Sequence, residues 1–334
     1  MLRFGLIGMG AHGSRYAAHL AQDVPGARLA AVCRRDRAAG EAWAAAHGAR
    51  FYEDYDGLIA DPGVDAVAAV TTPDLHLDIA RKAASRGKHL LIEKPLSVNA
   101  MEAARLARAV AGSPVTVMVA QTLRWNSVVR ALREHANEVG TLHVLRLSQR
   151  MEGQPHPWQR DEAVAGGGNI LHTGIHLFDL VRHLTGDEVE AVSCETRRVH
   201  NPALEDVFAA VMRLAGSGAL VLVDSSKATR SRSARIELVG EGGQLVGDHV
   251  HGYARRITGY EIVDLAPAAP VHTVREALSD FVAAVSRGGP PPVTVEDGLR
   301  AVEIAEACYR SAASRGPVAV ERASPEALDV RAEF

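Results

Sequence analysis

Cysteine, aromatic residues and lysine are all scarce in this chain of 334 residues. The three cysteines, Cys33, Cys194 and Cys308, lie far apart and form no CxxC pair. That usage excludes a disulfide scaffold and is typical of free thiols in a reducing compartment. Aromatic residues make up only 4% of the chain, which argues against the stacking surfaces that bind single-stranded nucleic acid.

Neither sign of charge is in large excess, because the chain has 37 Lys and Arg and 40 Asp and Glu, which gives a formal net charge of -3. This balance gives no electrostatic reason to bind nucleic acid or an anionic membrane. No apolar run approaches the roughly 20 residues that span a bilayer, and no leader precedes the strand-like run at residues 2–7. We expect a cytoplasmic protein whose partner is a small molecule.

Lysine occurs only as Lys82, Lys88, Lys94 and Lys227, so arginine is the default cation of this chain. An ammonium group loses its proton when it is desolvated, whereas a guanidinium group does not. Each lysine is therefore a better candidate for chemistry of its own than a lysine in an average sequence.

The first third alternates short apolar runs with longer, alanine-rich helical stretches. This alternation predicts an α/β unit over residues 1–122, a Rossmann-type, doubly wound parallel sheet covered on both faces. Strands are expected at Arg3–Ile7, Arg28–Cys33, Gly48–Tyr52, Ala66–Val70, His89–Ile92 and Val115–Val119, and helices at Gly13–Gln22, Arg37–His47, Tyr55–Ala60, Asp74–Arg86 and Val98–Ala111.

The pattern changes in residues 123–334, where strand-like runs follow one another without intervening helices. This part is expected to be an α+β domain with a mostly antiparallel, open sheet that binds the substrate and forms the oligomer. Strands are expected at Thr141–Arg150, Val189–Val199, Asp206–Leu214, Ala219–Ser225, Arg235–Val239 and Gln244–Asp248, helices at Val128–Val139, Asn169–Leu184, Val274–Ser286 and Val295–Ser314, and a loose tail at Arg322–Phe334.

A glycine-rich loop follows the first strand and opens the first helix, the context in which a GxGxxG pattern predicts dinucleotide binding. Its glycines allow a tight turn, a close approach of the pyrophosphate and close packing of helix on strand. The loop and candidate cofactor site consist of Gly8, Met9, Gly10, Ala11, His12 and Gly13.

The residue that selects between NAD and NADP is expected about 20 positions further on. Arg34 and Arg35 stand there, followed by Asp36. A pair of guanidinium groups suits a 2′-phosphate, so NADP is slightly favoured. The alternative is that both arginines are solvated and that Asp36 holds the ribose of NAD.

Polar residues also end the fourth and fifth strands, where ligands bind in sheets of this kind. Thr71, Thr72 and Pro73 end the fourth strand, and Glu93 and Lys94 end the fifth, before a proline that permits a cis peptide bond. Two weaker candidates for cofactor or substrate contact are His76 and Gln121.

The second domain carries three consecutive glycines followed by His172 and His176, which share one face of a helix. No HExxH pattern or acidic third ligand accompanies them, so we expect no metal. Asp179 either orients the His176 ring or makes a structural contact. Substrate contacts are also proposed for Arg124 and, in a lid loop, Trp158.

The order of these motifs resembles the glucose–fructose oxidoreductase / inositol dehydrogenase family (Gfo/Idh/MocA) over nearly the whole chain. The resemblance is carried by the Gly8–Gly13 loop, Thr72-Pro73 with His76, Glu93-Lys94-Pro95, Arg124-Trp125, the Gly166–Asp179 stretch, and Ile236–Leu245 with Gly240 and Gly243. It implies an NAD(P)-dependent oxidoreductase that acts on a secondary alcohol or ketone of a sugar or cyclitol.

In that family the lysine of the EKP motif and the histidine of the later helix assist proton transfer, and these positions match Lys94 and His176. An imidazole suits proton abstraction near neutral pH, and a desolvated ammonium stabilises a developing alkoxide. The family often has an aspartate four residues before the histidine, where this chain has His172. His172 is able to form hydrogen bonds but is not an anion.

Two other functions remain open at this point. One is a non-catalytic sensor or scaffold that keeps the dinucleotide fold, and the other is a redox-assisted glycosidase with tightly held NAD. An open sheet face needs cover, so a homodimer or homotetramer is expected.

Overall fold

Six parallel strands form the first sheet of the computed structural model, which describes residues 1–153 and 157–323. Their order is β3-β2-β1-β4-β5-β6, so the expected doubly wound Rossmann sheet is confirmed. The strands are β1 Leu2–Ile7, β2 Ala27–Cys33, β3 Arg50–Tyr52, β4 Ala66–Ala69, β5 His89–Glu93 and β6 Val117–Ala120, and the helices between them are α1 Gly13–Gln22, α2 Arg37–His47, α3 Tyr55–Ala60, α4 His76–Ser85 and α5 Ala100–Val110.

Local sequence sets the starts of several of these helices. The side chains of Asp36, Asp54 and Asn99 each accept a hydrogen bond from a backbone amide in the first turn of α2, α3 and α5. Such capping satisfies amides that have no partner inside the helix. The strands are apolar on both faces, and all four residues of β4 are buried, as a sheet covered by helices requires.

The second sheet has nine strands in the order β14-β13-β12-β11-β7-β10-β9-β8-β15, and only the β7–β10 pair is parallel. The expected mostly antiparallel sheet is therefore confirmed. Its inner residues are buried and its outer residues reach solvent, as the alternation along β9 shows. Its strands are β7 Leu142–Glu152, β8 Val189–Arg197, β9 Val207–Leu214, β10 Leu220–Ser226, β11 Ala228–Gly240, β12 Gly243–Asp248, β13 Tyr253–Thr258, β14 Glu261–Asp264 and β15 Val318–Ala319.

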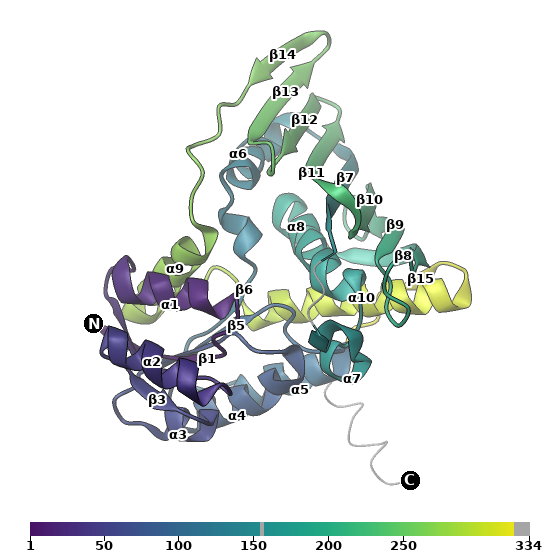
Figure 1. Ribbon diagram of the computed structural model, residues 1–334. Coiled ribbons are helices and arrows are strands. Elements are labelled where there is room, and N and C mark those ends of the chain that lie inside the picture. The colour runs from purple at the N-terminus through teal and green to yellow at the C-terminus, as the bar shows by residue number, and fades with distance from the viewer. Residues whose placement is uncertain (154–156, 324–334) are drawn as a thin grey trace.

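Some elements differ from expectation. The hairpin of β13 and β14, at the far end of the sheet in Figure 1, was not predicted, because its strands are short, largely exposed and interrupted by charges. The helix expected at Asn169–Leu184 is a π-helix, Ile170–Gly174, that continues into α8, Ile175–Thr185. The expected tail falls mostly outside the described residues, which end at Ala323.

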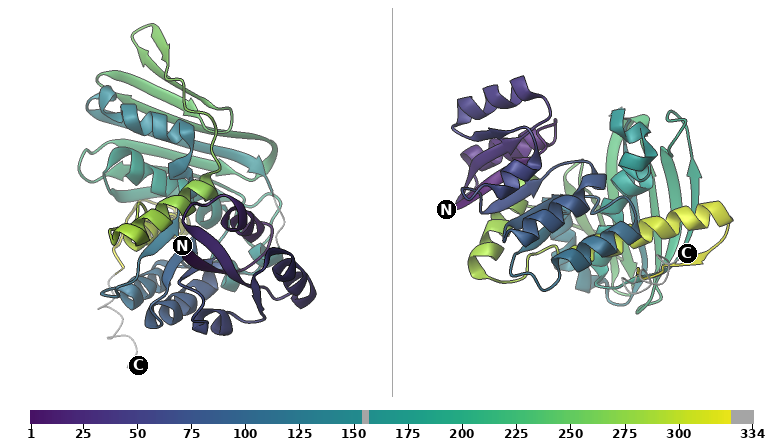
Figure 2. Two further views of the ribbon diagram at one scale, coloured as in Figure 1. Left: turned by 90° about the vertical axis from the view of Figure 1, so that its left-hand side faces the viewer. Right: turned by 90° about the horizontal axis from the view of Figure 1, so that it is seen from below.

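Helices from the second half of the chain return to the first sheet. The helix α9, Thr273–Arg287, lies beside α1 (Figure 1), and the Phe281 ring is 5.8 Å from the Phe4 ring. The helix α10, Val295–Ser314, contacts α5, α8 and β8 as it crosses between the two sheets (Figure 2).

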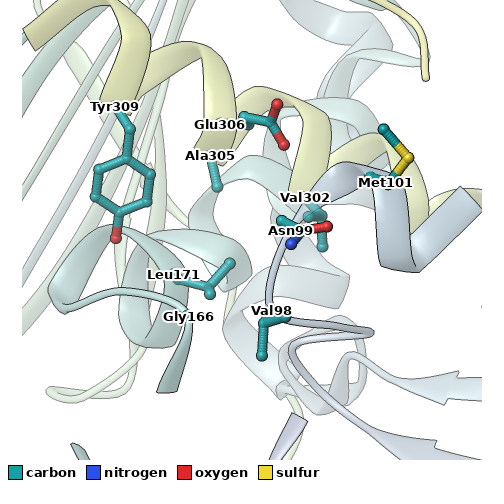
Figure 3. Close-up of a pocket in the computed structure, with 9 residues that line it drawn as sticks. All are labelled: Val98, Asn99, Met101, Gly166, Leu171, Val302, Ala305, Glu306 and Tyr309. Carbon is teal, nitrogen blue, oxygen red and sulfur yellow. The ribbon is translucent and has the colours of Figure 1, made fainter. Parts of the chain in front are cut away.

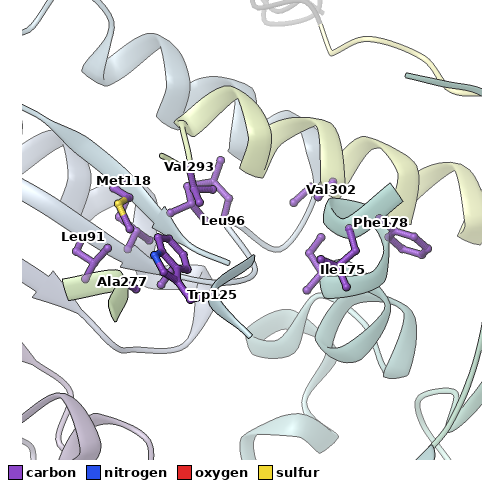
Figure 4. Packing of buried hydrophobic residues seen from close by; sticks show 14 of the residues in the cluster. Leu91, Leu96, Met118, Trp125, Ile175, Phe178, Ala277, Val293 and Val302 are labelled. Atoms are coloured by element: carbon purple, nitrogen blue, oxygen red, sulfur yellow. The ribbon is translucent and has the colours of Figure 1, made fainter. Parts of the chain in front are cut away.

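One continuous apolar core results, which Figure 4 shows between Met118 of β6, Trp125, and Ile175 of α8. Because this core is shared, the ends of β5 and β6 are held in a fixed relation to α8. The helix α6, Ser127–His135, covers β12 and β13. Among the described residues, no helix has both the length and the apolar character that a membrane crossing needs.

Candidate active site

The glycine loop between β1 and α1 has the geometry that a dinucleotide requires. Gly8 has a φ of 93°, and a Cβ atom there would lie 2.2 Å from the carbonyl oxygen of Val70. A Cβ atom on Gly13 would lie 1.9 Å from the carbonyl oxygen of Gly8. A Cβ atom on Gly10 would meet nothing within 4 Å, so this side of the loop is open. The open space lies at the start of α1, where backbone amides favour a phosphate.

His12, the only titratable side chain of this loop, is tied to the EKP segment. Its Nε2 donates to Glu93 Oε1 at 2.7 Å, and the Tyr16 hydroxyl donates to the same oxygen at 2.5 Å. The Lys94 amide donates to Glu93 Oε2 at 3.0 Å. Burial raises the pKa of Glu93, but His12 and Lys94 outweigh this effect and leave it below its ordinary value. Glu93 is 5% exposed, so it joins the loop to β5 rather than reaching into open space.

Arg34 and Arg35 follow the end of β2, as the sequence indicated. Asp36 is the N-cap of α2, where its Oδ1 accepts from the Ala39 amide at 3.1 Å, and its Oδ2 lies 3.6 Å from Arg34 Nη2. Both carboxylate oxygens of Asp36 therefore have partners within the protein, whereas Arg35 is exposed.

The segment after β4 contains Thr71, Thr72 and Pro73, and it begins the 3-10 helix Pro73–Leu75 that precedes α4. His76 was expected beside the ligand, but it is fully buried. Its Nδ1 lies 3.1 Å from the carbonyl oxygen of Pro95 and 3.2 Å from that of Leu96. His76 therefore supports the EKP segment through Nδ1, while its Nε2 has no partner among the described residues.

The side chain of Lys94 connects the end of the first sheet to the second domain. It follows β5, its peptide bond to Pro95 is cis, and its Nζ donates to the carbonyl oxygen of His172 at 3.1 Å. Burial lowers the pKa of Lys94, while Glu93 opposes that shift. The residue is partly exposed, and the bond to His172 uses one of the three ammonium protons.

His176 lies in the first turn of α8, close enough to Lys94 for the ammonium charge to act on its ring. Its Nδ1 lies 3.1 Å from the Oε1 of Gln121. An amide oxygen only accepts, so Nδ1 carries the proton and Nε2 keeps a free lone pair. Burial lowers the pKa of His176 far below its ordinary value, and Lys94 and His249 lower it further. The ring is therefore neutral near pH 7, and its free nitrogen is able to accept a proton.

His172 and Trp158 lie together on the second-domain side. The two ring centroids are 5.1 Å apart in an edge-on arrangement. His172 is 6% exposed, and its Nε2 has no partner among the described residues. Burial, together with Lys227 and Lys94, lowers the pKa of His172 far below its ordinary value. Residue 172 is thus a neutral imidazole, whereas the family often has a carboxylate at this position.

The structure decides between the two alternatives for Asp179 and corrects the substrate contact expected of Arg124. Asp179 does not orient His176: its two carboxylate oxygens accept from Arg124 at 2.6 and 2.8 Å. Arg124 also lies 3.3 Å from Asp297, so its guanidinium joins α8 to α10 and is not free for a substrate. The side-chain amide of Asn169, just before the π-helix, donates to the carbonyl oxygen of Asp206 and to Ser225.

Three further polar side chains belong to this site and were not predicted as site residues. Gln149, Lys227 and His249 lie on or just beyond β7, β10 and β12. Lys227 and His249 both act on the pKa of His176, and Gln149 Oε1 and His249 Nε2 have no partner among the described residues. The scarcity of lysine was the available signal for Lys227, whereas nothing in the sequence distinguished the other two.

A hollow of about 280 Å³ lies elsewhere, between the start of α5, the Gly166–Leu171 segment and α10 (Figure 3). None of the described side chains that line it is a candidate catalytic group. Within residues 1–153 and 157–323, no group of three His, Cys, Asp or Glu side chains is placed to hold a metal ion.

Fold and site together define a dinucleotide-binding oxidoreductase, and comparison with known families agrees. Residues 2–121 match the Gfo/Idh/MocA model described as an oxidoreductase family with an NAD-binding Rossmann fold, and residues 135–320 match the model of its C-terminal alpha/beta domain. The protein belongs to the Gfo/Idh/MocA oxidoreductase family.

Its relatives include several cyclitol dehydrogenases. The chain is 32% identical to inositol 2-dehydrogenase 2 of Saccharopolyspora erythraea, with 98% of each chain covered. It is 30% identical to myo-inositol 2-dehydrogenase of Thermotoga maritima, covering 96% of this chain and 99% of the relative. Among solved structures, a probable dehydrogenase from Thermotoga maritima matches with a TM-score of 0.84 and 27% identity over 97% of this chain and 100% of that one.

Proposed function

We propose that the protein is an NAD(P)-dependent oxidoreductase that transfers a hydride between nicotinamide and a secondary alcohol or ketone of a sugar or cyclitol. The observation that carries the proposal is that Lys94, from the first half of the chain, reaches the turn before His176, in the second half, and that its charge acts on His176. Lys94 Nζ bonds to the carbonyl oxygen of His172 at 3.1 Å, one helical turn before His176. The names of the inositol dehydrogenase relatives support the substrate class.

When bound, the nicotinamide ring supplies the acceptor or donor of the hydride. In the oxidation, a C–H bond and the O–H bond of the alcohol break and a C=O bond forms, with the hydroxyl proton passing to Nε2 of His176. Gln121 holds the other nitrogen of that ring in its protonated state. The Lys94 ammonium donates to the oxygen on which negative charge develops. In the reverse direction, His176 returns the proton.

The open side of the loop at Gly10 and the amides at the start of α1 suit the pyrophosphate of the cofactor. NADP is the preferred cofactor in this proposal, because Arg34 and Arg35 stand at the end of β2 while Asp36 is engaged as a helix cap. NAD is the alternative, which a comparison of both cofactors decides directly.

The test is a panel of sugars, cyclitols and their oxidised forms, assayed with NAD and with NADP by nicotinamide absorbance. A steady absorbance change with at least one secondary alcohol or ketone is expected. Absence of any change across the panel, in both directions and with both cofactors, contradicts the proposal.

A homodimer or homotetramer formed through the second sheet is also part of the proposal. The outer face of this sheet exposes Val211 and Leu220, which are 49% and 48% exposed. A second copy of the chain covers such a face most simply. Light scattering coupled to size exclusion is expected to give a mass of two or four chains, and a monomer at all concentrations contradicts this part.

A further inference from the structure

Lys227 is a second ammonium group in the candidate site. It follows β10, on which Val221, Val223 and Ser225 are buried on the inner face of the sheet. Alternation along the strand places Lys227 on the same face. Its charge reaches both His172 and His176, whose pKa values it lowers, and Lys94 in turn lowers the pKa of Lys227. The ammonium groups of Lys94 and Lys227 are therefore close enough to repel each other.

Among the described residues, the side chains of the other three lysines have partners, whereas the Lys227 ammonium has no carboxylate within ion-pair distance. Lys82 pairs with Asp56 and Asp78, Lys88 donates to two carbonyl oxygens, and Lys94 donates to one. Within residues 1–153 and 157–323, no carboxylate lies at ion-pair distance from Lys227. The described part of the chain thus holds a half-buried cation and supplies no carboxylate that pairs with it.

The two carboxylates whose charges act on Lys227 have other partners. Glu205 Oε1 accepts from the Ile170 amide at 2.8 Å and from the Tyr309 hydroxyl at 2.9 Å. Asp206 Oδ2 accepts from three successive backbone amides, those of residues 199, 200 and 201. Both carboxylates raise the pKa of Lys227 from a distance, yet neither is placed to bond to it.

Several polar atoms of the candidate site have no hydrogen-bond partner among the described residues. Gln121 Nε2 and His172 Nε2 have no partner among the described residues. Both residues are buried: Gln121 is 1% exposed and His172 is 6% exposed. The buried Nε2 atom of His249 also has no partner among the described residues. Buried polar atoms in native proteins normally have partners, so these atoms point to a polar ligand that completes the site.

We propose that the substrate carries an anionic oxygen group, a carboxylate or a phosphate, which Lys227 binds. This inference rests on the proposed function and narrows its substrate class to acidic or phosphorylated sugars and cyclitols. Lys227 takes the anionic group, which leaves Lys94 for the reacting oxygen. The described histidines nearby are neutral, so the two ammonium groups dominate the charge of the space that the substrate enters.

The proposal predicts a pH dependence. Burial and Lys94 lower the pKa of Lys227 to about 8. The groups whose charges interact with Lys227 are Lys94 after β5, His172 and His176 on the π-helix and α8, and Glu205 and Asp206 before β9; His249 after β12 acts on His176 in turn. The ammonium is charged below its pKa and neutral above it, so KM for an anionic substrate rises as the pH passes above about 8.

The experiment uses the full chain with saturating cofactor and three sugars that differ in one group: an aldose, its uronate and its 6-phosphate, in the gluco and galacto series. At least one anionic member is expected to show a KM about tenfold below that of the aldose. Comparison of the uronate with the phosphate identifies which anion is bound.

Substitution of Lys227 separates charge from shape. Lys227→Met is expected to raise KM for the anionic member about tenfold or more and that for the aldose less than about twofold. Lys227→Arg is expected to retain most of the preference, and Lys82→Met, in the first domain, serves as the matched control. Equal losses on both sugars, or a wild-type preference for the aldose, overturn the inference.

Failure of the proposed function is distinguishable from failure of this inference. If no sugar is turned over, the hydride-transfer proposal fails, and calorimetry on the cofactor-saturated protein still decides the question. Binding of the anionic member that Lys227→Met abolishes supports the inference. Equal binding of anionic and neutral members, or binding of neither, contradicts it.

Discussion

The ammonium of Lys94 donates a hydrogen bond to the main-chain carbonyl oxygen of His172 at 3.1 Å, across the junction of the two sheets. This contact fixes the end of β5 against the turn that precedes His176. It also places the positive charge of Lys94 at the carboxyl ends of the Rossmann strands, where dinucleotides bind in folds of this type.

Gln121 is predicted to act through His176. Gln121→Leu removes the acceptor that keeps the proton on Nδ1, so we expect kcat to fall about 10- to 100-fold with little change in KM. Gln121→Glu keeps an acceptor and adds a negative charge, which raises the pKa of His176.

A pH profile of the Gln121 variants distinguishes positioning from mere packing. In the wild type, oxidation loses rate only as the pH falls through the strongly lowered pKa of His176, so activity persists well below pH 6.5. In Gln121→Glu this acidic limb moves to higher pH. An unmoved limb contradicts the positioning role.

Cofactor choice is predicted to depend on the two arginines after β2. The double substitution Arg34→Ala with Arg35→Ala removes the charges proposed to hold a 2′-phosphate, so KM for NADP is expected to rise about tenfold or more while KM for NAD changes little. Arg28→Ala, at the exposed start of the same strand, is the control. Equal effects on both cofactors reject phosphate recognition.

His172→Asp is predicted to change substrate preference. A carboxylate at this position attracts Lys94 and Lys227, whose charges already act on His172. It therefore competes with an anionic substrate, and we expect the ratio of kcat/KM for acidic over neutral sugars to fall about tenfold or more. His172→Asn, which adds no charge, is the matched control. An unchanged ratio in both variants places residue 172 outside the working site.

Arg124→Leu is predicted to destabilise the fold. The carboxylate of Asp179 is 1% exposed, and without its partner it is left buried and unpaired, at a cost of about 3–5 kcal/mol. Urea unfolding measures this loss, and Arg124→Leu with Asp179→Leu is expected to recover most of it. Arg37→Leu, which breaks exposed pairs with Glu41 and Glu53, is expected to leave the free energy of unfolding almost unchanged, because water screens such pairs. Similar losses for both single variants contradict the structural role.

The sequence predicted the two sheets because their patterns are local: short apolar runs between helices in one half, and alternating runs in the other. It also marked Lys94 and His176 through motifs. It did not show that Gln121 meets His176, because these residues are 55 positions apart. They are brought together by the packing of the 3-10 helix Thr122–Trp125, which follows Gln121, against α8.

Burial was the other quantity that the sequence did not provide. His76 and Glu93 stand at the edge of the Rossmann sheet as expected, yet the turn at Pro95 and the side chain of His12 enclose them. Arg124 was read as a residue of the cleft, although the partner that holds it, Asp179, belongs to a helix that follows much later in the chain.

The central claim is that the Lys94 ammonium takes part in the chemistry and not merely in binding the cofactor. The most direct measurement compares kcat and the Kd of reduced nicotinamide cofactor in the wild type, in Lys94→Ala and in the control Lys82→Ala, on one sugar from the panel that the wild type turns over. The account predicts that kcat falls about 10²- to 10³-fold in Lys94→Ala while the Kd changes less than about threefold, and that Lys82→Ala behaves as the wild type. Turnover by Lys94→Ala within about twofold of the wild type would contradict it.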